Sequence, residues 1–208
     1  FTFIAGWGSG VFTAGNDLQD FLKPAGQAAD SPVLRFMLAL ARAEKPVVAA
    51  VNGAAVGIGV TLLLHCDLVY LADDARLSMP FVSLGLVPEF ASSLLVPQWA
   101  GHARAAEKIL LGLPFGAAEA LAMGLASAVL PADQVLAHAR AMAARFARLP
   151  PGAVRESKRL LRRAQARLVE ETIHEEARAF GARLGGPEVR EAVAAFYEKR
   201  PPDFSRAG

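Results

Sequence analysis

The sequence predicts an α/β fold, and three observations carry that prediction. A short, wholly apolar run at residues 47–51 and a run at 67–71 that is apolar after Asp67 have the length and composition of strands that are buried on both faces of a parallel sheet. A short helical stretch lies between these two runs, which is the pattern of a strand–helix–strand unit. Hydrophobic residues make up 53% of the 208 residues, so the chain can bury a full core.

The first 17 residues predict a strand, a second short apolar step and the start of a helix. Residues 1–5 predict a strand, and a glycine-rich loop then leads to a short apolar step at 11–13 and a turn at 14–16. Asp17 indicates a helix start, because its carboxylate can accept the free amides of the first turn and offset the positive end of the helix dipole. The first residue is Phe and already lies inside a strand pattern, so we expect an N-terminal piece to be missing.

The next elements form the predicted α/β core. A helix is expected over 31–43, with Ser31 as its cap and apolar residues at helical spacing. The buried strand at 47–51 follows, and the turn after it leads into a helix over 60–65. The run at 67–71 then returns as a second buried strand.

Helical signals dominate beyond Pro88. Pro150-Pro151 interrupts them and is the natural boundary between an α/β body at 1–149 and a helical region at 150–208. A short strand is expected near Val129. The expected helices are 92–100, 102–111, 116–122, 132–148, 152–165, 168–184 and 187–199.

Composition narrows the classes of partner. The chain has 22 Lys+Arg against 20 Asp+Glu, a formal net charge of +2, so neither nucleic acid nor a membrane is expected as a partner. The single cysteine, Cys66, excludes an internal disulfide and a multi-cysteine metal site, which fits a reducing cytoplasm. No run of about 18 apolar residues suggests a membrane span. The basic stretch at 155–167 is interpreted as a solvated helix face, with an RNA- or phosphate-binding patch as the alternative.

Two glycine-containing turns, at 14–17 and 55–59, stand out as candidate anion sites. Each places backbone N–H groups at the start of a helix, where those groups lack intrahelical partners. Neither turn matches a dinucleotide-binding or P-loop pattern. His65 and Cys66 are expected to be buried structural residues, and Asp67 a structural carboxylate with its partners satisfied. The remaining histidines lack the spacing of metal ligands, so no metal site is expected.

Both turns lie within stretches that resemble the signatures of a known family. Residues 12–18, FTAGNDL, and residues 48–70, VAAVNGAAVGIGVTLLLHCDLVY, are similar to the two signatures of the crotonase (enoyl-CoA hydratase/isomerase) family. Pro88-Glu89, AAEALAMG at 117–124 and AVLP at 128–131 follow in the family's order. The resemblance implies a spiral of ββα units with a C-terminal helical trimerisation region, assembled as a homotrimer or hexamer.

The resemblance also implies a site for an acyl-coenzyme A thioester. The backbone N–H groups of Asn16 and Ile58 would bind the thioester oxygen, and no cofactor other than the coenzyme A of the substrate is expected. A developing enolate needs such donors, each worth about 3–4 kcal/mol. The residues expected to bind coenzyme A are Thr13, Ala14, Gly57 and Lys23, with Phe196 and Lys199 reaching a neighbouring subunit's site.

The predicted reaction depends on which carboxylate side chains stand at the family's catalytic positions. Hydratases of this family use two glutamates, and here Thr61 and Phe81 stand at those positions, so neither can exchange a proton near neutral pH. Glu89 lies in a segment, GLVPEFASS, that resembles the peroxisomal type of Δ3,Δ2-enoyl-CoA isomerases, in which one glutamate here moves the proton from C2 to C4. The apolar neighbours of Glu89 should raise its pKa by desolvation.

Two alternatives stay open beside the isomerase. The same oxyanion site could support hydration or another crotonase reaction on a coenzyme A thioester. A non-catalytic protein that binds acyl-CoA, or RNA through residues 155–167, is the alternative from another class, although no aromatic residues interleave with those arginines.

Overall fold

The computed structural model describes residues 1–6, 10–22 and 31–206. Its first sheet is wholly parallel and has the strand order β1-β3-β5-β8, from β1 (Thr2–Ala5), β3 (Val47–Val51), β5 (Leu68–Ala72) and β8 (Ala128–Leu130). All five residues of β3 are buried, as the apolar run predicts for a central parallel strand. Helix α6 (Val135–Phe146) packs against β1, β3 and β5.

A second sheet lies beside the first, in the order β2-β4-β6-β7. Its strands are β2 (Val11–Thr13), β4 (Ala54–Val56), β6 (Arg76–Ser78) and β7 (Phe115–Gly116), and only the β6–β7 pair is antiparallel. Strands β4 and β6 are additional to the strands expected from the sequence. Three residues are too short to show an alternating pattern, so these strands are defined by their sheet partners.

The two sheets arise from a repeated unit. From β1 to β6, consecutive strands go to different sheets, since β1, β3 and β5 each enter the first sheet and the strand that follows each of them enters the second. Each pair is followed by helical segments: η1 (Leu18–Leu22) and α1 (Pro32–Ala41), then α2 (Ile58–Thr61) and η3 (Leu62–His65), then η4 (Val82–Leu84), α3 (Ser92–Ala100) and α4 (His102–Ile109). This arrangement confirms the predicted spiral of ββα units.

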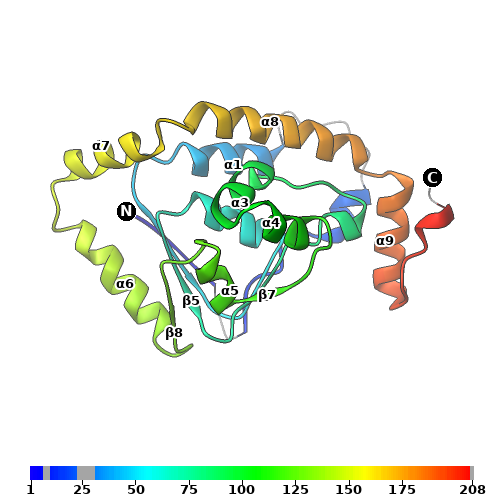
Figure 1. The fold of residues 1–208 in the computed structure, drawn as a ribbon, viewed down its shortest axis with the longest axis horizontal. Coiled ribbons are helices and arrows are strands. Elements are labelled where there is room, and N and C mark those ends of the chain that lie inside the picture. The colour runs from blue at the N-terminus through cyan, green and yellow to red at the C-terminus, as the bar shows by residue number, and fades with distance from the viewer. Residues whose placement is uncertain (7–9, 23–30, 207–208) are drawn as a thin grey trace.

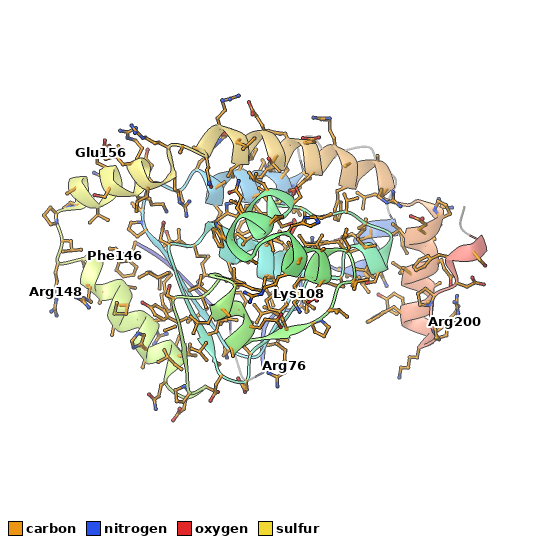
Figure 2. The ribbon with its side chains drawn as sticks, in the orientation of Figure 1. Arg76, Lys108, Phe146, Arg148, Glu156 and Arg200 are labelled. Atoms are coloured by element: carbon orange, nitrogen blue, oxygen red, sulfur yellow. The ribbon has the colours of Figure 1, made fainter. Side chains whose placement is uncertain are left out.

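Local signals account for several helix ends. Ser31 caps α1, since its Oγ accepts the N–H of Leu34 at 3.1 Å and Pro32 occupies the first helical position. The segment after Asp17 forms the 3-10 helix η1 instead of an α-helix. Asp17 still serves as expected there, because its Oδ1 accepts the N–H of Gln19 at 2.9 Å. In α5 (Ala117–Ala122), Glu119 pairs at 2.8 Å with the buried Lys108 of α4, which is labelled in Figure 2.

Three helices follow Pro150: α7 (Pro151–Arg162), α8 (Ala166–Arg183) and α9 (Pro187–Glu198), and the short η5 (Phe204–Arg206) comes after them. The long α8 runs alongside α1 across one side of the molecule, and α9 turns away beyond its end (Figure 1). At the end of α9, Arg200 pairs with Glu191 and Glu198 (Figure 2). No helix in the described ranges has the length and apolarity needed to cross a membrane.

Helix α7 is tied to the core through Asp67. The carboxylate of Asp67 accepts the N–H of Val47 at 2.7 Å and pairs with Lys158 at 2.7 Å and Arg162 at 3.3 Å. Lys158 also donates to the carbonyl of Lys45 at 2.8 Å. The expectation that Asp67 is a satisfied structural carboxylate is therefore confirmed.

The apolar residues of α7 and α8 divide into two groups. Leu160, Leu161 and Leu168 are exposed, and Leu161 retains 86% of its accessible surface. Ile173 is fully buried within its own chain. Helix α8 packs on α1 and α3 of the same chain, so Ile173 is covered without a neighbouring subunit.

Candidate active site

The two glycine turns meet because their strands are neighbours. Strands β2 and β4 pair in parallel, with Thr13 opposite Ala55, so the turns that follow their carboxyl ends lie side by side. Gly15 has a φ of +85° and Gly57 a φ of +57°, conformations that side chains other than that of glycine rarely adopt. A Cβ added at Gly15 would lie 2.9 Å from the carbonyl oxygen of Val56. Glycine is therefore required for both the turn and the close approach.

Each turn presents one backbone N–H that has no acceptor among the residues that the structure describes. Ile58 is the first residue of α2, where no intrahelical acceptor exists, and Asn16 lies in the turn after β2. Among the described residues, neither the N–H of Asn16 nor that of Ile58 donates a hydrogen bond. Both residues line one small cavity. Two unpaired donors therefore lie at the wall of the same space, as an oxyanion site requires.

Glu89, in the segment between η4 and α3, also lines this cavity. Its side chain is buried, with 5% of its surface exposed, and Oε1 accepts the hydroxyl of Thr61 at 2.5 Å. Burial raises the pKa of Glu89 from its ordinary 4.5 to about 7, the Thr61 hydrogen bond lowers it, and the nearby charge of Glu176 raises it. The predicted upward shift by desolvation is confirmed. A carboxyl group with this pKa can both take and return a proton near neutral pH.

The cavity has a volume of about 60 Å³. Glu89 is the one ionisable side chain among the described residues that line it, and Phe81 forms part of the apolar wall. Cavities that enclose a whole drug-sized ligand measure about 300–1,000 Å³, so this one has room for the reacting end of a substrate and not for a complete acyl-CoA. The lining residues are Ala14, Gly15, Asn16, Leu18, Phe21, Val56, Gly57, Ile58, Pro80, Phe81, Leu84, Leu86, Glu89 and Phe180.

Phe180 is a site residue that the sequence does not reveal. It comes from α8 and packs edge-on against Phe21 of η1, with ring centroids 5.8 Å apart. The two residues are 159 positions apart, and Phe180 occupies an ordinary apolar position of an amphipathic helix. No local pattern marks it, because the contact depends on how α8 crosses the body of the protein.

A larger cavity, of about 480 Å³, lies between η3, α3 and the α7–α8 junction. It contains neither glycine turn, and its carboxylates are already paired, Asp67 with Lys158 and Arg162 and Glu170 with Arg42. The smaller cavity is the candidate active site, because that is where free N–H donors and a carboxyl group of raised pKa converge.

His65 and Cys66 have the structural role expected of them. The imidazole of His65 is buried, its Nε2 lies 2.7 Å from the carbonyl oxygen of Phe90, and burial lowers its pKa to about 4. Burial also raises the pKa of the Cys66 thiol to about 12, so it is not a reactive thiolate. Within the described ranges, no group of three or more His, Cys, Asp or Glu is placed to hold a metal ion.

The residues predicted to bind coenzyme A fall into three groups. Ala14 and Gly57 line the cavity, and the Oγ1 of Thr13 accepts the N–H of Gly15 at 3.2 Å, which supports the first turn. Lys23 lies outside the described residues. Phe196 and Lys199 are exposed and do not line this chain's cavity, so their role at a neighbouring subunit stays a prediction.

Known proteins share both the sequence and the fold. Residues 2–207 match the family model for enoyl-CoA hydratase/isomerase. A probable enoyl-CoA hydratase of Bacillus subtilis is 34% identical, over 93% of this chain and 77% of the relative's length. Enoyl-CoA delta isomerase 2 of Rattus norvegicus is 37% identical, over 91% of this chain and 50% of the relative's length. The chain therefore spans half to three quarters of the length of these relatives.

The structural match is equally broad. The crystal structure of an enoyl-CoA hydratase/isomerase from Pseudoalteromonas atlantica superposes with a TM-score of 0.88 at 44% identity, over 95% of this chain and 78% of the other. The family match, over residues 2–207, covers both glycine turns and the Glu89 segment. From its sequence, its ββα spiral and the extent of these matches, this chain belongs to the enoyl-CoA hydratase/isomerase, or crotonase, family.

Proposed function

We propose that this protein moves a carbon–carbon double bond in an acyl-CoA, converting a 3-enoyl-CoA to a 2-enoyl-CoA. One observation carries the proposal: a single buried carboxyl group, with a pKa of about 7, shares its cavity with the two unpaired N–H groups of the glycine turns. The coenzyme A arrives as part of the substrate, and the reaction needs no other cofactor.

Each group has a defined task in this reaction. The N–H groups of Asn16 and Ile58 bind the thioester oxygen and stabilise the negative charge that develops when a C2 proton leaves. The carboxylate of Glu89 takes that proton and the resulting carboxylic acid returns it at C4, so the double bond moves from C3–C4 to C2–C3 with no net gain or loss of atoms. One carboxyl group is enough because the proton leaves and returns on the same face.

The residues that replace the two hydratase glutamates argue against hydration. Phe81 is apolar, and Thr61 is fully buried with its hydroxyl already donated to Glu89. Hydration requires one group to activate water and a second to protonate the α-carbon. The relatives bear the names of both hydratases and isomerases, so the direct assay must measure both reactions.

The test uses 3-enoyl-CoA substrates of short and long chain length. Isomerisation creates a conjugated thioester and increases its ultraviolet absorbance, whereas hydration of a 2-enoyl-CoA destroys that absorbance. We expect Glu89→Gln to lower kcat by about 10²- to 10⁴-fold, the loss typical for a missing general base, with little change in coenzyme A affinity. Glu175→Gln, which removes an exposed carboxylate from α8, is the matched control and should keep the wild-type rate.

Two results would contradict the proposal. A Glu89→Gln enzyme that isomerises at nearly the wild-type rate would exclude Glu89 as the base. A wild-type enzyme that hydrates 2-enoyl-CoA faster than it isomerises 3-enoyl-CoA would assign the hydratase reaction instead.

A further inference from the structure

The segment that carries Glu89 has an unusual backbone. Phe90 and Ala91, the two residues that follow it, both have positive φ angles, of 62° and 57°. Non-glycine residues in this region cost about 1 kcal/mol or more each, so the surrounding structure must hold them there. Both side chains are fully buried. The direction in which Glu89 enters the cavity therefore depends on contacts that stabilise a strained turn.

The same turn forms an incomplete helix start. Ala91 is the N-cap of α3, a position that favours Ser, Thr, Asp or Asn, and it has no side-chain oxygen with which to bind the first N–H groups of the helix. The N–H of Ser92 is accepted locally, by the carbonyl oxygen of Glu89 at 3.1 Å, but those of Ala91 and Ser93 need an acceptor from elsewhere in the chain.

Glu176 of α8 supplies that acceptor. Its Oε2 accepts the N–H of Ala91 at 2.5 Å, and its Oε1 accepts both the N–H and the hydroxyl of Ser93, at 2.9 and 2.5 Å. Its side chain is buried, with 7% of its surface exposed. All three partners are donors, so an ionised carboxylate, which has acceptors only, satisfies them without placing a donor against a donor. Burial raises the pKa of Glu176, and the hydrogen bonds from Ser93 and Ala91 act against that rise by lowering it.

Other contacts complete the support of the turn. Ser92 donates from its Oγ to the carbonyl oxygen of Glu89 at 2.7 Å, and the ring of His65 stacks on that of Phe90 with centroids 4.0 Å apart. Helix α8 reaches the same stretch of chain a second time, where Arg183 donates to the carbonyl of Gly85 at 2.6 Å. Glu176 is the contact that ties the N-cap itself to α8.

We propose that Glu176 is a positioning residue for the acid/base step: from α8, its carboxylate holds the Phe90–Ala91 turn and so directs Glu89 into the cavity. This inference rests on the proposed function of Glu89. Glu176 does not line the cavity, so it acts only through the turn.

The test compares Glu176→Gln with the neighbouring Glu175→Gln, which removes the same charge from an exposed position of α8. The amide of Gln keeps one oxygen but turns a donor toward one of the three donors that Glu176 binds. Because a misplacement of about 1 Å costs about 100-fold in rate, we expect kcat for 3-enoyl-CoA isomerisation to fall about 100-fold in Glu176→Gln. The KM and the affinity for the coenzyme A product should change little, and Glu175→Gln should keep the wild-type kcat.

The pH profile separates positioning from a mere loss of folded protein. Two groups change the pKa of the buried Glu89: the Thr61 hydroxyl from α2 lowers it, and the charge of Glu176 from α8 raises it. His65, which stacks on Phe90, is neutral because burial lowers its own pKa to about 4. Removing the Glu176 charge should move the midpoint of kcat/KM to lower pH. A smaller fraction of folded enzyme would scale the whole profile without moving its midpoint.

The inference and the proposed function fail in different ways. If Glu176→Gln keeps the wild-type kcat and pH midpoint while Glu89→Gln is inactive, only the positioning role is overturned. If Glu89→Gln is active, the proposed function is overturned. If Glu176→Gln does not fold, the change is made together with Ala91→Gly, since glycine adopts this φ without strain. A double variant with the same kcat as Ala91→Gly alone would also overturn the inference.

Discussion

Replacing Thr61 by Val tests how the protein sets the proton affinity of Glu89. Valine has nearly the shape of threonine but cannot donate the 2.5 Å hydrogen bond to Oε1 of Glu89. Both side chains are buried, so no solvent water replaces the lost donor. This bond lowers the pKa of Glu89, and its loss should therefore raise that pKa above about 7.

The size of the effect follows from the strength of the bond. A hydrogen bond to a charged group contributes about 1.5–3 kcal/mol, and each pH unit corresponds to about 1.36 kcal/mol, so the midpoint of the kcat/KM profile should rise by about one to two pH units. At pH 7, the ionised fraction of Glu89 should fall from about one half to about 1–10%, which lowers the rate about 5- to 50-fold.

The assay is isomerisation of a 3-enoyl-CoA between pH 5.5 and about 9.5 with Thr61→Val and the control Thr61→Ser, which keeps the hydroxyl. The rate of Thr61→Val should recover at alkaline pH, and Thr61→Ser should follow the wild-type profile. An unchanged midpoint, or a loss of rate that persists at alkaline pH, would refute this reasoning.

Three further predictions concern stability and assembly. The raised pKa of Glu89 contributes stability that is fully present below pH 4.5 and is lost as pH rises through about 7. At pH 8, Glu89→Gln should therefore be more stable than wild type by up to about 3 kcal/mol in urea unfolding. At pH 4.5 it should have no such advantage. Lys158→Met removes a buried ammonium group from the partly buried Asp67 carboxylate and should cost about 2 kcal/mol, whereas Arg159→Met, in an exposed ion pair, should leave the stability nearly unchanged by the same measurement. We expect wild type to sediment as a trimer or a dimer of trimers. Leu161→Glu, which replaces an exposed apolar residue by a charged one, should weaken this assembly. A wild-type monomer at micromolar concentration would contradict the expectation.

Interactions between nearby residues explain why so much of the α/β core could be predicted. The buried runs that became β3 and β5 have a composition that suits only a strand covered on both faces. Ser31 and Pro32 start α1 through bonds and angles that involve the next few residues alone. The glycines at 15 and 57 mark turns that their positive φ angles require, and Glu89 was identified by the segment around it.

The tertiary structure decided the features whose partners are distant in the sequence. Strands β4 and β6 have only three residues each, and their neighbours in the sheet define them. The sequence showed only that Thr61 cannot exchange a proton, but folding brings its hydroxyl against Glu89, 28 residues away. Glu176 and Phe180 look like ordinary helix residues, because the path of α8 across the body determines what they touch. The sequence by itself therefore determined the elements and the acid/base candidate, and only the packing of distant segments decided how that carboxyl group is buried, oriented and tuned.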